Sequence, residues 1–172
     1  MYEDKEAAEP LMEYRDILYR IAFSNMKNKS DAEDVVQEAY CRYLKTKPVF
    51  DSKDHEKAWF IRVVINICHD LHKSVWFTKT VAFDEVPESE MKHFNLPFME
   101  EDETLWHVME LPIGYRNPLY LFYYEDYSIR EIAQIMELEE GTVKTRLKRG
   151  REMIKERILY GGKVKDNLKD KV

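Results

Sequence analysis

Glycine and proline are scarce in this sequence, which has five glycines and six prolines among 172 residues. That scarcity excludes a low-complexity chain. Cysteine is rarer still, because only Cys41 and Cys68 are present, far apart and without the spacing of a metal site. Two such cysteines suit a reducing cytoplasm, and neither a metal nor a cofactor is expected.

Long apolar runs are also missing. None approaches the roughly 18 consecutive residues that a membrane-spanning helix needs. The N-terminus, MYEDKEAAEP, is acidic and polar and has no basic region followed by an apolar stretch, so it lacks the pattern of a secretory signal. We therefore expect a cytoplasmic protein without membrane insertion.

Motifs of catalysis are missing as well. The sequence has no phosphate-binding glycine loop, nucleophile elbow or paired metal-ligand motif, and its histidines and cysteines are scattered. His69 and His72 could in principle share a metal at helical spacing, but no third ligand is evident. An enzyme is therefore not expected.

Helical periodicity is what the sequence does contain. Hydrophobic residues make up 44% of it and recur at helical rather than alternating spacing, which predicts an almost entirely α-helical protein. Prolines and polar clusters interrupt the pattern at residues 46–53 and 111–118. We predict two small helical domains on an acidic flexible linker. The predicted parts are a domain over 1–74, the linker over 75–103, a domain over 104–160 and a polar tail over 161–172.

A pair of short helices with a tight turn between them is predicted after residue 126. Ser128 and Glu131 fit the S-x-x-E capping box that begins a helix. An apolar stripe at helical spacing follows as far as Met136, and the polar residues 137–140 mark the turn. This layout is typical of a helix-turn-helix, whose second helix enters the major groove of DNA.

The second helix of this unit carries basic side chains everywhere except on its buried face. Val143, Leu147, Gly150 and Ile154 fall on one side at about 100° per residue, which predicts the core face. Arginine suits a bidentate contact with guanine and threonine a thymine methyl, whereas flanking lysines suit phosphates. A solvated basic face is the alternative, and the capped partner helix favours DNA. The predicted DNA contacts are Thr142, Thr145, Arg146 and Arg149, roughly opposite the core face, with Lys144 and Lys148 on its flank.

Charge is divided unevenly along the chain, whose formal net charge is -6. Residues 127–172 hold 12 Lys and Arg against 8 Asp and Glu, whereas residues 1–126 hold 15 against 25. The C-terminal part is therefore suited to DNA, and the remainder should prefer a basic or mixed partner.

Two further helices stand out in the N-terminal domain. The segment SDAEDVVQEAYCRYLK has a second S-x-x-E box, Ser30 and Glu33, and an acidic outward face that is either solvated or docked on a basic partner. The helix from about His55 to Lys73 is apolar over more than half its circumference, so it should pack against several neighbours. Its polar stripe is either a solvent-facing edge or a reader of unpaired bases. The stripe comprises Arg62, Asn66, His69, Asp70 and Lys73.

Four segments occur in an order that is more specific than any one of them. They are DAEDVVQEAY, AWFIRVVINICHD, LPIGYRNPLYLFYYEDYSIREIAQIM and GTVKTRLKRGREMIKERI. This order resembles the bacterial sigma-70 family, specifically its small extracytoplasmic-function (ECF) subgroup, over nearly the whole chain from about Tyr14 to Ile158. The family consists of RNA polymerase sigma factors, non-catalytic subunits that bring core polymerase to promoters and help to open them. The resemblance implies core RNA polymerase and promoter DNA as partners. It also implies an anti-sigma protein as a further partner, although no residue here identifies one.

The resemblance implies roles for single residues. The first segment resembles the helix that docks on the clamp coiled coil of the largest polymerase subunit. Its implied contacts are Asp34, Gln37 and Glu38. Asn66 matches the position that in related factors receives a flipped non-template base of the minus-ten element. The residues implied to line the same strand are Arg62, Asp70 and Lys73. The helix-turn-helix resembles the domain that reads the minus-thirty-five element, and the acidic linker is expected to thread the basic RNA channels of the polymerase.

Three positions depart from the family pattern. Glu137 stands in the turn where glycine is usual, and a left-handed conformation there would add strain. Glu139 stands where the recognition helix usually begins with serine, and glutamate is a weaker N-cap. Gly150 replaces a common alanine inside the helix, at a cost of up to about 1 kcal/mol. These departures predict a less rigid DNA-reading head.

The competing function is a free-standing helix-turn-helix regulator that binds duplex DNA without polymerase, usually as a dimer on half-sites. The two-domain order and the EDVVQEA helix favour the sigma factor.

Overall fold

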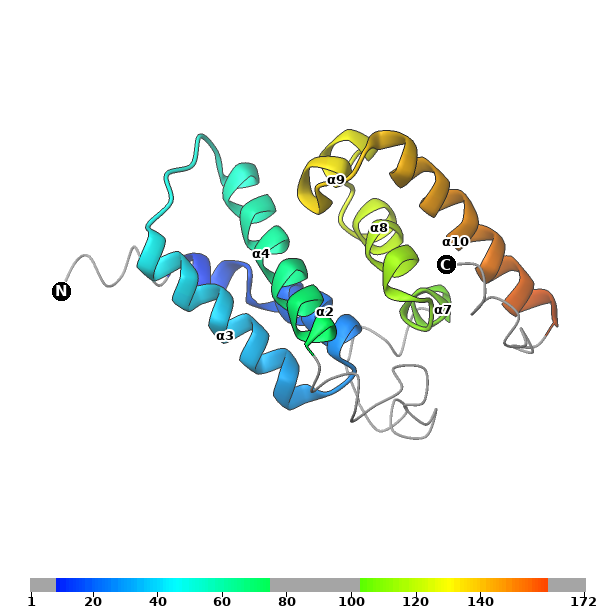
Figure 1. Cartoon of the computed structure of the whole chain (residues 1–172), viewed down its shortest axis with the longest axis horizontal. Helices are drawn as coiled ribbons and strands as arrows, with labels where there is room; N and C mark the ends of the chain where they lie inside the picture. The colour runs from blue at the N-terminus through cyan, green and yellow to red at the C-terminus, as the bar shows by residue number, and fades with distance from the viewer. Residues whose placement is uncertain (1–8, 75–102, 161–172) are drawn as a thin grey trace. The chain divides into compact units, whose positions relative to one another are not determined.

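The computed structural model describes residues 9–74 and 103–160, and within these ranges every regular element is an α-helix. Contacts divide the chain into two compact units, Met1–Phe94 and Asn95–Val172 (Figure 1). The predicted all-α architecture of two small helical domains is thereby confirmed. The linker and tail predicted from the sequence lie outside the described residues, except for Glu103, and the domain limits at 74, 104 and 160 stay predictions.

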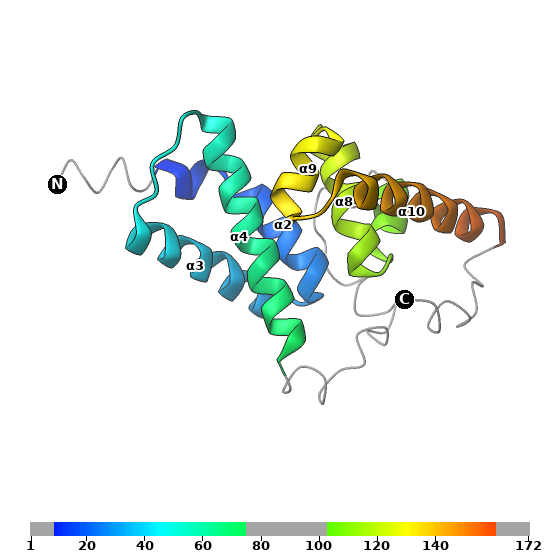
Figure 2. The same cartoon turned by 45° about the horizontal axis from the view of Figure 1, so that its top comes forward.

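In its described residues, the N-terminal unit contains the helices α2 (Arg15–Met26), α3 (Lys29–Thr46) and α4 (Lys53–Lys73), preceded by a short helical segment over residues 9–13. Each of α2, α3 and α4 packs against the other two (Figures 1 and 2). They do so because each has an apolar stripe at helical spacing, and burial of one such side chain stabilises the fold by about 1.5–3 kcal/mol. The largest fully buried side chains of this unit are Leu18, Ile21, Phe23, Phe60, Ile61 and Ile65.

The start of α3 corrects one sequence prediction. Ser30 and Glu33 do not form the predicted capping box, because the helix already begins at Lys29 and Asn28 is its N-cap. The Asn28 Oδ1 atom accepts the backbone N–H of Asp31 at 2.8 Å, and Asn28 Nδ2 donates to Asp31 Oδ2 at 2.5 Å. Asparagine caps a helix as well as serine does, so α3 can begin two residues before the predicted cap at Ser30.

Over residues 103–160, the C-terminal unit contains α7 (Glu103–Met109), α8 (Ile113–Tyr124), α9 (Ile129–Met136) and α10 (Glu140–Tyr160). The long helix α10 packs against α7, α8 and α9 (Figures 1 and 2). The buried side chains at this junction include Leu119, Leu121, Ile132, Val143 and Leu147. They give α9 and α10 a shared core in which the turn between the two helices is fixed.

The predicted break over residues 111–118 is wrong over most of its length. Helix α8 begins at Ile113 with Pro112 as its N-cap residue and continues through Pro118. The buried Arg116 side chain, which is 3% exposed, donates from Nη2 to the Leu111 carbonyl at 2.5 Å. This bond fixes the chain just before the helix. Because proline has no N–H, the carbonyl four residues earlier, that of Gly114, loses its usual helical donor.

The described residues contain neither a membrane-spanning helix nor a cluster of metal ligands. Within 9–74 and 103–160, no helix is both long and apolar enough to cross a bilayer. The same ranges contain no group of three or more His, Cys, Asp or Glu side chains placed to share a metal ion.

Candidate polymerase and promoter interfaces

Helix α9 begins with the predicted capping box. The Ser128 hydroxyl accepts the backbone N–H of Glu131 at 3.3 Å, and Glu131 Oε2 accepts the backbone N–H of Ser128 at 2.8 Å. Hydrogen bonds from the Ser128 hydroxyl and from its backbone hold the pKa of Glu131 below its ordinary value. A lowered folded-state pKa means that the box stabilises the helix above the ordinary glutamate pKa of about 4.3 and is lost as pH falls below it.

The turn between α9 and α10 contains the left-handed backbone conformation that the sequence indicated at Glu137. Glu137 lies in the left-handed region, with φ 55° and ψ 47°. Its N–H donates to the Ala133 carbonyl, which also accepts the N–H of Leu138 at 2.9 Å. Glycine normally ends a helix in this way because it has no Cβ to clash. Glu137 is therefore a strained position at the centre of the helix-turn-helix.

Replacing Glu137 with glycine should stabilise the C-terminal unit by about 1 kcal/mol, because glycine adopts the left-handed region without the penalty of a Cβ. Chemical denaturation of the full chain would measure the change. The matched control is Glu152→Gly, the same chemical change at an exposed interior position of α10. That control should destabilise by roughly 0.5–1 kcal/mol. Equal destabilisation by both variants would show that the turn at Glu137 carries no strain.

Helix α10 separates a buried face from an exposed basic face. Val143, Leu147 and Gly150 are buried, as predicted, whereas Ile154 is only half-buried. Glu139 precedes the first helical residue, and its carbonyl accepts the N–H groups of Thr142 and Val143 at 3.0 and 3.1 Å. Exposure then divides the predicted DNA contacts into two groups: Lys144, Thr145, Lys148 and Arg149 are exposed, whereas Thr142 and Arg146 are half-buried.

Arg146 does not lie opposite the core face, which corrects its predicted position. It follows Val143 by three residues, so it lies at the margin of that face, and its Nη1 atom donates to the Gly114 carbonyl of α8 at 3.5 Å. The Thr145 hydroxyl donates back to the Gly141 carbonyl at 3.0 Å. Lys148 and Arg149, which are both exposed, are therefore the main candidates for DNA contact on the basic face.

Gly150 also has a different role from the one predicted. A Cβ built on it would lie 2.4 Å from Leu119 Cδ1 and 3.2 Å from Leu119 Cγ. Leu119 is fully buried, so it has little room to move away. The missing side chain is what lets α10 approach α8, and the interpretation of Gly150 as a simple cost to the helix is corrected.

The acidic face of α3 is exposed as predicted. Its buried side consists of Ala32, Val35, Val36 and Ala39. The three candidate polymerase contacts on the other side, Asp34, Gln37 and Glu38, are all exposed. Glu38 Oε1 accepts from Arg42 Nε at 2.9 Å, one turn later on the same helix, so its charge is partly balanced there. Asp34 contributes a second exposed carboxylate, and Gln37 an uncharged amide.

The polar stripe of α4 runs along the side of the helix that the core leaves uncovered. Asp70 and Lys73 are exposed, whereas Arg62, Asn66 and His69 are half-buried. Phe60, Ile61, Val64 and other apolar residues occupy the buried side, as the periodicity predicts. Asn66 is half-buried, and its side-chain amide has both a donor and an acceptor.

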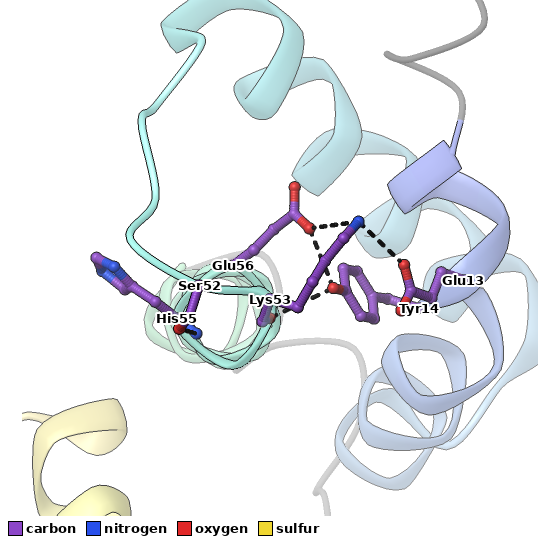
Figure 3. Close-up of polar contacts among 6 residues, drawn as sticks. All are labelled: Glu13, Tyr14, Ser52, Lys53, His55 and Glu56. Atoms are coloured by element: carbon purple, nitrogen blue, oxygen red, sulfur yellow. Dashed lines mark hydrogen bonds and ion pairs between the residues drawn. The ribbon is translucent and has the colours of Figure 1, made fainter.

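A polar cluster at the start of α4 was not predicted. The buried Tyr14 hydroxyl donates to Glu56 Oε2 at 3.0 Å, and Lys53 Nζ lies 3.3 Å from Glu13 Oε2 and 3.4 Å from Glu56 Oε2 (Figure 3). Burial, with the Glu56 carboxylate beside it, raises the pKa of the Tyr14 hydroxyl. Ser52 caps the helix by accepting the N–H of His55 at 3.1 Å. No local pattern joins Tyr14 to Glu56, which lie 42 residues apart, and their hydrogen bond ties the residue before α2 to the first turn of α4.

Comparisons with known proteins assign both units. The family described as Sigma-70 region 2 matches residues 11–78, and the family described as Sigma-70, region 4 matches residues 108–154. These matches span α2 to α4, the end of α7, α8, α9 and most of α10. They therefore include the acidic face of α3, the polar stripe of α4 and the basic face of α10.

Whole-chain relatives agree with these two matches. The ECF RNA polymerase sigma factor SigM of Bacillus subtilis is 31% identical, over 89% of this chain and 94% of its own length. The ECF RNA polymerase sigma factor SigW of the same organism is 26% identical over 84% of each chain. The sigma factor RpoE of Bartonella quintana, solved with the anti-sigma factor NepR, has the same fold, with a TM-score of 0.62 at 18% identity over 90% of this chain and 98% of that one. The chain belongs to the ECF subgroup of the sigma-70 family, and it is an RNA polymerase sigma factor that directs core polymerase to promoters and assists their opening.

Proposed function

We propose that the two units of this sigma factor divide the promoter between them. The exposed face of α10 reads the minus-thirty-five element as duplex DNA, and the polar stripe of α4 reads the minus-ten element as an opened strand. The acidic face of α3 docks on core polymerase. The domain limits that serve this division are residues 1–74 and 104–160, with the intervening segment threading the polymerase.

The observation that carries this proposal is the separation of faces on α10. Val143, Leu147 and Gly150 pack inward, whereas Lys148 and Arg149 point away from the core with their charges exposed. A helix held in this way fits the major groove, where arginine pairs with guanine and lysine with phosphate. The chain as a whole is acidic, so this local basic face is the part that phosphate attracts.

Three further groups complete the α10 surface. The exposed methyl of Thr145 suits a thymine methyl, because its hydroxyl already donates to Gly141. Lys144 lies on the flank with Lys148 and suits phosphate. Thr142, half-buried in the first turn, lies where the N-terminal residues of a recognition helix meet base edges.

Asn66 is the proposed minus-ten reader. Its half-buried amide lies on α4 one turn before Asp70 and one turn after Arg62. An amide pairs with an unstacked base through its donor and its acceptor together. Arg62 and Lys73 suit the phosphates of the same strand, because both carry positive charge.

Docking on polymerase is proposed for α3. Asp34 and Gln37 are exposed, and Glu38 is held by Arg42. An exposed acidic surface on a negatively charged domain favours a basic partner. Action through binding alone, without a catalytic step, follows from these roles.

Substitution of Asn66 by alanine should reduce minus-ten discrimination about tenfold, because the base loses its hydrogen-bonding partner, while binding to core polymerase is unchanged. The measurement is transcription by the reconstituted holoenzyme from a promoter library randomised over the minus-ten element, with a parallel titration of core polymerase. Asp34→Lys is the reciprocal variant: it should weaken core binding and leave discrimination intact. Weaker core binding by Asn66→Ala would show that Asn66 belongs to the polymerase interface instead.

An anti-sigma protein is a further proposed partner. The solved structure of RpoE from Bartonella quintana, which shares this fold, contains an anti-sigma factor. The faces proposed to bind polymerase and DNA are exposed here, so a protein that covered either of them would inactivate the factor.

A free-standing regulator is disfavoured. Such a protein needs only the helix-turn-helix, whereas this chain also matches Sigma-70 region 2 over residues 11–78. That region contains the α3 and α4 faces.

A further inference from the structure

Helix α8 contains an interior proline, and this leaves one backbone acceptor short of a donor. Pro118 is the sixth residue of α8. Its ring nitrogen carries no hydrogen, so it cannot bond to the carbonyl four residues earlier. That carbonyl belongs to Gly114, in the first turn of the helix. A backbone acceptor in a packed region normally finds a substitute partner.

Arg146 of α10 supplies a donor at this point. Its Nη1 atom donates to the Gly114 carbonyl at 3.5 Å. The same guanidinium is what a Cβ at Gly114 would meet, at 3.9 Å from Nη1 and 4.0 Å from Cζ. Arg146 is half-buried, so its charged group is partly withdrawn from solvent.

The remainder of α10 is held by other contacts. Gly150 packs directly on Leu119 of α8. The Arg157 guanidinium donates to the Glu110 carboxylate and to the Glu110 carbonyl, and thereby ties the C-terminal half of α10 to the end of α7. Arg146 is the polar tie nearest the first turns of α10, where the proposed DNA contacts begin.

We propose that Arg146 is a positioning residue for promoter recognition, and that it acts by replacing the N–H that Pro118 lacks. Its bond to Gly114 sets the rotation of α10 on α8, so that Arg149 and Lys148 face the groove. The inference rests on the proposed function of α10 and assigns Arg146 to that helix's support rather than to base contact. Pro118 and Arg146 then form a pair, because the proline lacks the N–H donor that the arginine guanidinium replaces.

A double-mutant cycle in the full-length chain tests this pairing. Arg146→Ala should lower the ratio of folded to unfolded protein about tenfold, as expected for loss of a hydrogen bond from a charged donor. Pro118→Ala restores a backbone N–H to Gly114. In that background, removal of Arg146 should therefore change the ratio by less than about twofold.

Transcription with core polymerase provides the readout that a purely structural role would not move. On promoters varied singly along the minus-thirty-five element, Arg146→Ala should lower output on all variants alike, and adding Pro118→Ala should restore it. Arg146→Lys, which keeps a donor, should recover part of the output, whereas Arg146→Met, of similar length but without a donor, should recover none. The Lys and Met pair decides the question even if Pro118→Ala misfolds.

Other outcomes overturn the inference. A loss confined to one base pair and unchanged by Pro118→Ala would make Arg146 a base reader. Lower stability with unchanged transcription would reduce it to a structural bond, and no change in either would remove the pairing altogether. If the wild-type factor itself showed no promoter preference, the proposed function would fail, while the stability cycle would still decide whether Arg146 and Pro118 are coupled.

Discussion

Replacing Arg149 with alanine is expected to weaken promoter recognition by about 1–3 kcal/mol at a single base pair of the minus-thirty-five element. Arg149 is exposed on the outward face of α10, and Leu147 and Gly150 on either side of it anchor the backbone. A guanidinium so placed can bond to both acceptors of one guanine, and alanine can bond to neither.

The measurement is transcription by the reconstituted holoenzyme from promoters with every single substitution across the element. The matched control is Lys148→Ala, the neighbouring exposed cation. That variant should weaken binding about equally on all sequences and lower the salt dependence by roughly one phosphate contact. If Arg149→Ala also lost output uniformly, Arg149 would be a phosphate contact, and base readout would lie elsewhere on α10.

Replacing Gly150 with alanine is the second large effect that we expect, and its sign is opposite to that given by helix propensity. Alanine is favoured over glycine in a helix by about 0.8–1 kcal/mol. The new Cβ would lie 2.4 Å from Leu119 Cδ1, and overpacking of a filled core typically costs about 1–3 kcal/mol. Because Leu119 is fully buried, we expect a net destabilisation of roughly 1–2 kcal/mol.

The same change at Gly141 is the control, since a Cβ there meets nothing within 4 Å. Gly141→Ala lies in the first turn of the same helix and should stabilise it by up to about 1 kcal/mol. Denaturation of the two variants beside the wild type gives both signs in one experiment. A stabilised Gly150→Ala would mean that α8 and α10 can separate at little cost and that the register of α10 is not fixed by this contact.

Local signals in the sequence predicted local structure well. The Ser128 and Glu131 box needs only four consecutive residues, and it forms as predicted. Glu137 stands where glycine is usual, and this one position indicated a left-handed turn. The backbone of Glu137 has that strained conformation. The box proposed at Ser30 failed for a local reason too, because Asn28 offers an equally good cap two residues earlier.

Features that depend on distant residues were not predictable in the same way. Pro118 indicates a helix break when only its neighbours are considered, yet α8 continues through it while Arg146, 28 positions later, donates to Gly114. The value of Gly150 depends on Leu119 in another helix. The hydrogen bond between Tyr14 and Glu56 joins residues that lie 42 positions apart. Periodicity specifies a helix face, and only packing specifies what that face meets.

This chain is expected to act on promoters as part of RNA polymerase and not by itself. The most direct test adds the purified full-length chain to core polymerase and a promoter library randomised at both elements, and sequences the run-off transcripts. We predict transcripts that start at a fixed distance from two selected elements, and none from core polymerase alone. Tight binding to duplex DNA without polymerase, together with no stimulation of transcription, would show instead that the chain is a free-standing DNA-binding regulator.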